Sequence, residues 1–189
     1  MSGSLPELST EGAVDALIAG EVIAWPTEAV WGLGCDPYNP KAVAKLLSIK
    51  QRPVEMGLIL IAADFEQLQN LLSPVTVCEM RRALGSWPGP VSWLFPVKSD
   101  TPDWLRGKHQ TLAVRVTDHP LSRRLCRAFG GPLVSTSANP TASAAATSLD
   151  ELKKYFSGSE LAGYLDGDLG EQSNVSEIRD LISNTLIRG

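Results

Sequence analysis

Residues 132–140 read PLVSTSANP, and this stretch passes from apolar to polar within a few positions. Leu133 and Val134 are typical of a buried strand, whereas the hydroxyl residues and the amide that follow present hydrogen-bond donors and acceptors. In open α/β sheets, ligands bind beyond the ends of the strands, where loops deliver polar groups. The stretch therefore predicts a strand of a sheet that leads directly into a binding site.

Strand-like and helix-like segments alternate along the chain. Strands are predicted at 22–25, 57–63, 90–97, 111–117, 132–136, 162–168, 176–181 and 185–188, with the last two as a hairpin. Helices are predicted from capping residues that precede apolar periodicity, at Thr10, Asn39, Asp64, Ser73, Asp118 and Ser148. The small, polar residues 141–148 predict a mobile loop. This alternation favours an α/β fold with a mixed sheet flanked by helices.

Composition and charge narrow the class of protein. The 189 residues are 43% hydrophobic and 20% charged, which is typical of a globular chain, and we expect a single domain over 1–189. A net charge of −4 argues against coating nucleic acid by bulk charge. The three cysteines are scattered, which predicts a reduced protein. We find no signal peptide and no apolar run long enough for a bilayer, so we expect a cytoplasmic protein away from membranes.

Polar residues also collect at three other predicted strand or helix ends. Residues 26–34 (PTEAVWGLG) follow a strand and form either a ligand loop or a simple glycine-rich turn. Lys50 and Arg52 end a helix, where cations often serve only as partners of the helix dipole. Arg115 lies within a strand, on the face opposite Val114 and Val116, and needs either an anion or a paired carboxylate. Together these places predict a cleft for a polyphosphate and a small polar substrate.

Several standard chemistries find no support in the sequence. It contains neither the Gly-x-x-x-x-Gly-Lys loop nor the Gly-x-Gly-x-x-Gly turn of nucleotide-binding proteins. His109 and His119 have no metal-like spacing, and His119 before Pro120 favours a structural role. No Gly-x-Ser-x-Gly elbow is present. A phosphate site in this chain must therefore be built from side chains.

Seven motifs, in this order, resemble the YrdC-like threonylcarbamoyl-AMP synthase family. They are PTEAVWGLGCD (26–36), KQRP (50–53), GLILIAA (57–63), WPGPVSWLFP (87–96), LAVRVTDHP (112–120), PLVSTSAN (132–139) and SEIRD (176–180). The resemblance extends from about residue 9 to the end of the chain. It implies a three-layer α/β fold in which a twisted mixed sheet and its helices surround a concave, positively charged cleft.

The resemblance also implies a reaction. Members of this family are nucleotidyltransferases that condense L-threonine, bicarbonate and ATP to threonylcarbamoyl-adenylate and pyrophosphate. A separate tRNA threonylcarbamoyl transferase complex then modifies the adenosine beside the anticodon of certain tRNAs. Mg²⁺ is expected to accompany ATP, held mainly through phosphate oxygens and water.

Site residues follow from the matching motifs. The resemblance places Lys50 and Arg52 as the catalytic residues at the ATP phosphates. The ATP site as a whole is then Lys50, Arg52, Arg115, Ser137 and Asn139. The threonine site is Thr27, Arg115, Ser135 and Ser176, and Arg179 lines the pocket.

The chain departs from the family pattern in places. Ala29 stands where many members have threonine, and Met56-Gly57 stands where long-form members often have His-Pro. Pro140 follows Asn139 where Ser-Gly is frequent. Because the sequence ends at Gly189 without the extra domain of the longer members, it resembles the short form.

Two alternatives remain open at this point. One is a non-catalytic RNA-binding module that uses the same basic cleft for tRNA or another RNA, widened by Arg81, Arg82, Arg123, Arg124 and Arg127. The other is the carbamoyl-transfer domain of hydrogenase maturation, which shares the fold. That domain requires appended acylphosphatase-like and zinc-finger-like regions, for which this chain has neither the length nor the cysteines.

Overall fold

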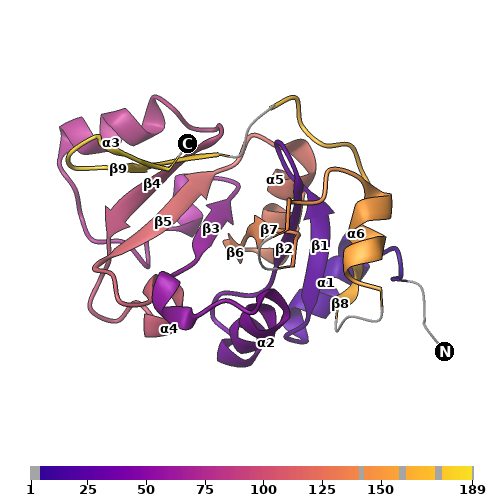
Figure 1. Ribbon diagram of the computed structural model, residues 1–189. Helices are drawn as coiled ribbons and strands as arrows, with labels where there is room; N and C mark the ends of the chain where they lie inside the picture. Colours follow the sequence, from indigo (N-terminus) through magenta and orange to yellow (C-terminus); the bar gives the residue numbers. More distant parts are fainter. Residues whose placement is uncertain (1–4, 141–142, 158–160, 173–175, 189) are drawn as a thin grey trace.

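The computed structural model describes residues 5–140, 143–157, 161–172 and 176–188 of the chain. Within these ranges, ten strands form two sheets, which lie next to each other in Figure 1. The four-stranded sheet has the order β7 (Thr136–Ser137), β2 (Trp31–Gly34), β1 (Val22–Pro26), β8 (Leu161–Tyr164). The six-stranded sheet has the order β10 (Leu186–Arg188), β9 (Glu177–Asp180), β4 (Val91–Pro96), β5 (Thr111–Val116), β3 (Ile59–Ala62), β6 (Leu133–Val134).

Helices connect and cover these strands. The α-helices are α1 (Thr10–Ile18), α2 (Pro40–Lys50), α3 (Val77–Leu84), α4 (Asp103–Arg106), α5 (Pro120–Phe129) and α6 (Leu149–Tyr155). Two short 3₁₀ turns, η1 (Val54–Met56) and η2 (Phe65–Gln67), flank β3. Among the described residues, no helix is both long and apolar enough to cross a bilayer. The predicted α/β class is confirmed.

Both sheets are mixed, as the short connections predict. In the larger sheet β3 runs parallel to β5, whereas β4 is antiparallel to β5. In the smaller sheet β1 is antiparallel to β2 and parallel to β8. The predicted C-terminal hairpin is confirmed, because β9 and β10 pair antiparallel at the edge of the larger sheet. The structure adds that the strands divide between two sheets.

The stretch 132–139 passes from one sheet to the other. Its strand β6 pairs with β3, and two residues later β7 pairs with β2. At the crossing, Val134 N–H donates to Cys35 C=O at 3.1 Å, and Ser135 N–H donates to Ile59 C=O at 2.9 Å. A Cβ atom on Gly34 would lie 1.9 Å from the Val134 carbonyl oxygen. Only glycine allows the two backbones to approach so closely.

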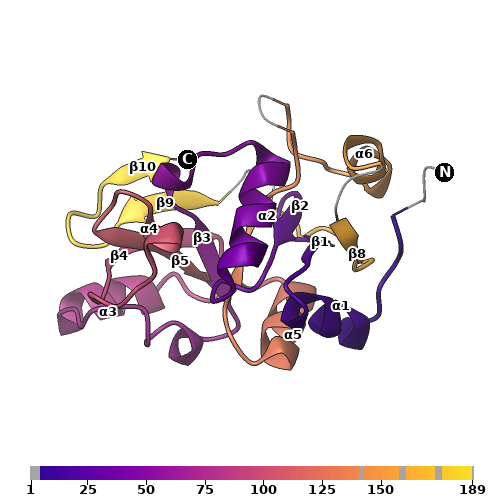
Figure 2. The same ribbon diagram turned by 90° about the horizontal axis from the view of Figure 1, so that it is seen from below.

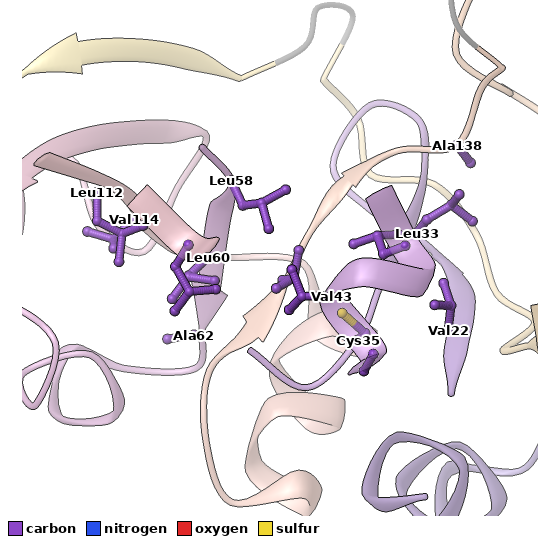
Figure 3. Close-up of a cluster of buried hydrophobic side chains, with 14 of the residues drawn as sticks. Val22, Leu33, Cys35, Val43, Leu58, Leu60, Ala62, Leu112, Val114 and Ala138 are labelled. Atoms are coloured by element: carbon purple, nitrogen blue, oxygen red, sulfur yellow. The ribbon is translucent and has the colours of Figure 1, made fainter. Parts of the chain in front are cut away.

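Alternate residues of the strands bury into two apolar clusters, one on each face. Val22 and Ala24 of β1 belong to the first cluster, which also contains the inner side chains of α2 (Figure 3). Ile23 and Trp25 belong to the second cluster, between the sheet and helices α1 and α5. Figure 2 shows α2 on one side of the sheets and the neighbouring helices α1 and α5 on the other. This helix–sheet–helix arrangement is the expected three-layer fold.

Local capping signals predict most helix starts to within a few residues. Asn39 caps α2 through bonds from the N–H groups of Lys41 and Ala42 at 3.0 and 3.2 Å. Ser148 caps α6. Three cap predictions were wrong in detail. Ser9 caps α1 in place of Thr10, Thr76 caps α3 in place of Ser73, and His119 caps α5 in place of Asp118. The Glu151 carboxylate accepts hydrogen bonds from the N–H and the hydroxyl of Thr147.

The loop predicted at 141–148 is only partly covered, because residues 141 and 142 lie outside the described residues. Within it, Ala146 is buried in the first apolar cluster, and its N–H donates to Ala138 C=O at 2.9 Å.

Candidate active site

A cavity of about 530 Å³ opens between the two sheets. The smaller sheet contributes Gly32 and the turn after β1, and the larger sheet contributes Ile59 and Arg115. The C-terminus of α2 and the crossing between β6 and β7 complete the wall. Eight of the nine predicted site residues line this cavity: Thr27, Lys50, Arg52, Arg115, Ser135, Ser137, Asn139 and Ser176.

Arg179 is the predicted residue that the described part of the cavity wall does not include. Its Nε donates to a carboxylate oxygen of Glu177 at 2.8 Å on the same strand, β9. Arg188 on the partner strand β10 lines the cavity in its place. The sequence analysis overlooked Arg188, although the predicted hairpin provides a signal, because pairing β10 with β9 brings a C-terminal cation beside the SEIRD motif.

Lys50 joins two motifs that are far apart in the sequence. The backbone turns at Gln51, whose left-handed conformation ends α2. From there the Lys50 ammonium group donates to Ser137 C=O at 2.6 Å, to Asn139 C=O at 2.8 Å and to Asn139 Oδ1 at 2.6 Å. Burial, and then the nearby charge of Arg52, lower the pKa of Lys50 to about 8. A lysine that serves only as a partner of the helix dipole does not need these specific contacts.

Arg52 lies beside Lys50 and holds the following loop. Its Nη2 donates to Gly57 C=O at 3.0 Å. Its Nε is buried and has no hydrogen-bond partner among the described residues. Burial, followed by the charge of Arg188, lowers the pKa of Arg52. A half-buried guanidinium with an unused donor in a cavity wall is suited to bind an anion.

Arg115 is paired with a carboxylate that the sequence analysis did not include among the site residues. Its Nη1 lies 3.1 Å from Oε2 of Glu28, and both side chains are less than one-tenth exposed. Thr117, on the same face of β5, donates its hydroxyl to Glu28 Oε1 at 2.5 Å. Burial lowers the pKa of Arg115, while Glu28 acts in the opposite direction. The strand alternation that separates Arg115 from Val114 and Val116 is confirmed, because both valines lie in the first apolar cluster.

The hydroxyl and amide groups are arranged around these cations. The Ser137 hydroxyl donates to Asn139 Oδ1 at 2.8 Å, and Asn139 Nδ2 donates to Ser143 C=O at 2.6 Å. The Thr27 hydroxyl donates to Val30 C=O at 2.7 Å. The Asn139 amide is therefore already bonded within the protein, and it fixes both Lys50 and its own turn.

The cavity is strongly cationic although the whole chain is acidic. Lys50, Arg52, Arg115 and Arg188 line it, and Glu28 is the one carboxylate among the described lining residues. Burial, followed by the charge of Arg115, lowers the pKa of Arg188 as well. Since these like charges lie close together in a partly buried site, an anionic ligand would relieve their repulsion.

Other candidate groups lie elsewhere. His119 Nε2 lies 3.0 Å from Asp168 C=O, and Nδ1 accepts from Ser122 N–H at 3.4 Å, which is the predicted structural role. No cluster of three or more His, Cys, Asp or Glu side chains that could hold a metal ion occurs within the described ranges.

The surface arginines do not widen the cavity. Arg123, Arg124 and Arg127 line a separate groove along α5 together with Asp118. Arg82 donates to the carbonyl groups of Leu181 and Ile182 near the C-terminal hairpin. The basic side chains proposed for an extended RNA surface are therefore not among the described residues that line the cavity.

Fold and site together define an α/β protein with a cationic cleft between two mixed sheets. A sequence model of the family Sua5_yciO_yrdC, described as "Telomere recombination", matches residues 15–188. The chain belongs to this family.

Relatives support the same assignment. A threonylcarbamoyl-AMP synthase of Cellvibrio japonicus is 47% identical over 176 residues, covering 93% of this chain and 93% of that protein. One of Pseudomonas paraeruginosa is 52% identical over 169 residues, covering 89% and 90%. The crystal structure of P. abyssi Sua5 complexed with L-threonine matches with a TM-score of 0.84 and 28% identity, covering 93% of this chain and 52% of that one. Escherichia coli YciO, at 24% identity and a TM-score of 0.83 over 100% of this chain and 95% of that one, has the same fold.

Proposed function

We propose that this chain is a threonylcarbamoyl-AMP synthase, which condenses L-threonine, bicarbonate and ATP to threonylcarbamoyl-adenylate and pyrophosphate. The observation that carries the proposal is the convergence of four cations from distant segments on one cavity, of which Lys50 and Arg115 are buried. The names of the curated relatives, which match about nine-tenths of the chain, support the same activity. In this role the chain would act as one domain, in the cytoplasm where its tRNA pathway operates.

The cations meet the main electrostatic difficulty of the reaction. A carbamate is already an anionic nucleophile, so no serine–histidine pair is required to activate it. Its oxygen must form a bond to the α-phosphorus of ATP, which itself carries negative charge, while the bond to the departing pyrophosphate breaks. Fixed cations in a partly buried site stabilise this accumulation of charge without having to reorganise during the reaction.

The proposed roles follow the positions of the side chains. Lys50 and Arg52 at the end of α2 hold the ATP phosphates, with Ser137 and Asn139 completing the nucleotide side. Arg188 adds a cation from β10. The threonine side comprises Thr27, Arg115, Ser135 and Ser176, where the guanidinium of Arg115 pairs with the substrate carboxylate.

Mg²⁺ fits this site as a companion of the nucleotide. Glu28 is the one carboxylate among the described lining residues, and it is already paired with Arg115. The ion would therefore be bound mainly through phosphate oxygens and water, which is common for Mg²⁺ with nucleotides. When bound, it shares the neutralisation of phosphate charge. The adenylate would pass to a tRNA threonylcarbamoyl transferase complex.

Isotope incorporation tests the proposed reaction. Purified protein is incubated with ATP, L-threonine and carbon-13 bicarbonate, and the products are separated and identified by mass spectrometry. We expect an adenylate that contains both threonine and the labelled carbon, formed together with pyrophosphate. An adenylate of threonine without the label, or no adenylate at all in the complete mixture, would contradict the proposal.

A further inference from the structure

The buried side chain of His119 makes two contacts, and only one of them belongs to the helix that it caps. The residue is 5% exposed and is not among the described residues that line the cavity. Its Nδ1 accepts from Ser122 N–H at the start of α5, whereas its Nε2 lies 3.0 Å from Asp168 C=O. A carbonyl oxygen can only accept, so the proton of the neutral ring is on Nε2 and Nδ1 is the acceptor. One tautomer therefore satisfies both contacts.

The second contact reaches the loop of residues 165–172, which follows β8 and lies against the turn after β1. Gly170 N–H of this loop donates to Thr27 C=O at 2.9 Å, and Gln172 N–H donates to Glu28 C=O at 3.1 Å. A Cβ atom on Gly170 would lie 2.7 Å from the Glu28 carbonyl oxygen, so the two backbones are in direct contact. The 165–172 loop thus holds the backbone of two residues that line the cavity.

His119 fixes the middle of the 165–172 loop to α5. Within the described chain, residues 166–169 donate no backbone hydrogen bond to β1, so the ladder does not hold this part of the loop. Asp168 C=O accepts from His119 there, and a Cβ atom on Gly167 would lie 3.1 Å from the side chain of Leu121 on α5. The position of the loop, and with it the bonds to the turn after β1, depends on this attachment.

We infer that His119 is a positioning residue for the threonine side of the cavity, which it supports through the 165–172 loop without contacting a substrate. The inference rests on the proposed function, because Thr27 is a proposed threonine contact. A reacting group has to be held close to its productive position, and a small displacement caused from outside the site lowers the rate substantially. His119 therefore has a role in substrate binding in addition to its role as the cap of α5.

Two variants separate the two contacts of the ring. His119→Asn places an amide oxygen near the position of Nδ1 and is a favoured N-cap, but its side chain is too short to reach Asp168. His119→Gln is one carbon longer, so its amide nitrogen can donate to Asp168 C=O in place of Nε2, but glutamine is not a favoured N-cap. His109→Asn is the matched control, since the exposed His109 is not among the described residues that line the cavity.

The first measurement is the initial rate of pyrophosphate release against the concentration of each substrate. His119→Asn should raise the KM for threonine about three- to tenfold, as for the loss of one hydrogen bond that positions the site. The KM for ATP should not change, because Lys50 and Arg52 belong to a different part of the wall. His119→Gln should restore the KM for threonine to near the wild-type value but lower the melting temperature by about 2–4 °C, as for a lost cap.

The second measurement is backbone hydrogen exchange by nuclear magnetic resonance, which does not depend on any activity. In His119→Asn, the amides of Gly170 and Gln172 should exchange faster while that of Ser122 stays protected. In His119→Gln the pattern should be reversed. If His119→Asn does not fold, Gly170→Ala displaces the same loop without touching α5, and it should raise the KM for threonine as well.

The outcomes separate this inference from the proposed function. An unchanged KM for threonine in His119→Asn, or equal effects of the asparagine and glutamine variants, would contradict the inference and leave His119 only as the cap of α5. A wild-type protein without threonine-dependent activity would contradict the proposed function. The exchange of Gly170 would still show in that case whether His119 holds the loop.

Discussion

The ammonium group of Lys50 connects the KQRP and STSAN motifs, which are far apart in the sequence. Its three bonds to the carbonyl and amide oxygens of Ser137 and Asn139 fix the end of α2 against the crossing between the sheets. The same contacts make its charge sensitive to the surroundings, and burial beside Arg52 lowers its pKa to about 8. A lysine in this range is still protonated at neutral pH and loses its proton in mildly alkaline solution.

A pH dependence follows from this pKa. ATP binds the protonated form of Lys50 better, so the KM for ATP should rise as the pH passes about 8. Lys50→Arg keeps the charge to much higher pH, and its KM should stay flat over that interval even if its absolute value is poorer. The measurement is initial rate against ATP concentration at several pH values. If the KM for ATP rises in the same way at alkaline pH in both proteins, the group that titrates is not Lys50.

Arg52 provides a second prediction at this scale. Arg52→Ala removes a charge from the proposed phosphate site and should cost roughly 2–4 kcal/mol in kcat/KM. The lost bond to Gly57 C=O should lower the free energy of unfolding by only about 1 kcal/mol. Arg124→Ala, on α5 outside the cavity, is the control and should leave both quantities unchanged. Steady-state kinetics measure kcat/KM, and urea unfolding measures the free energy of unfolding. Wild-type kinetics for Arg52→Ala would show that Arg52 serves only as a partner of the helix dipole.

Residue patterns predicted which polar side chains line the cavity better than they predicted the contacts between them. The KQRP and STSAN motifs could be found in the sequence because the type of side chain and the nearby chain break are local properties, and their side chains do line the cavity. Sequence reasoning left open whether Arg115 faces an anion or a carboxylate, and the structure shows Glu28, 87 positions away along the chain. Arg188 was missed for the same reason, since its approach to Arg115 depends on how the C-terminal hairpin joins the larger sheet.

At the scale of elements, local signals predict most helices and strands but neither α4 nor β2, which occupies the second half of the stretch 26–34 that was expected to be a loop or turn. They also do not predict the division into two sheets. Asn39 and Pro40 start α2 because the cap bonds connect neighbours in sequence. The cap of α1 shifted from Thr10 to Ser9 because both hydroxyl residues can accept the bond and the packing decides between them. The crossing at 132–139 depends on contacts with Cys35 and Ile59, which no local pattern encodes.

The crossing itself can be tested through glycine. Gly34→Ala would place a methyl group 1.9 Å from the Val134 carbonyl oxygen and 2.3 Å from the Trp25 ring, so the two sheets must separate. We expect a loss of several kcal/mol in the free energy of unfolding, as for severe overpacking. Gly12→Ala in α1 is the control, because its new Cβ atom would lie 3.6 Å from the nearest atom. That change should stabilise the helix by about 0.5–1 kcal/mol.

Denaturant unfolding of both variants distinguishes the outcomes. A Gly34→Ala protein as stable as the Gly12→Ala protein would show that the two backbones do not approach as closely as described.

For the whole molecule, the cleft lies between two sheets that the chain connects more than once, most directly at the crossing between β6 and β7. The larger sheet delivers Arg115 and Arg188, the smaller sheet delivers the turn with Thr27 and Glu28, and α2 brings Lys50 to the gap between them. The larger sheet alone does not complete the cavity, because the smaller sheet and α2 supply the rest of its wall. Under the proposed function, two substrates share this partly buried space, where orientation and electrostatic stabilisation are most effective.

Release of pyrophosphate from ATP is the most direct test of this account. The rate is measured by a coupled phosphate assay in the complete mixture and in mixtures that lack L-threonine, bicarbonate or the protein. We predict that release requires all three components together with ATP, and that Arg52→Ala reduces it strongly while Arg124→Ala does not. Pyrophosphate release that continues unchanged when threonine is omitted would contradict the central claim that the cleft joins a threonine-derived carbamate to the nucleotide.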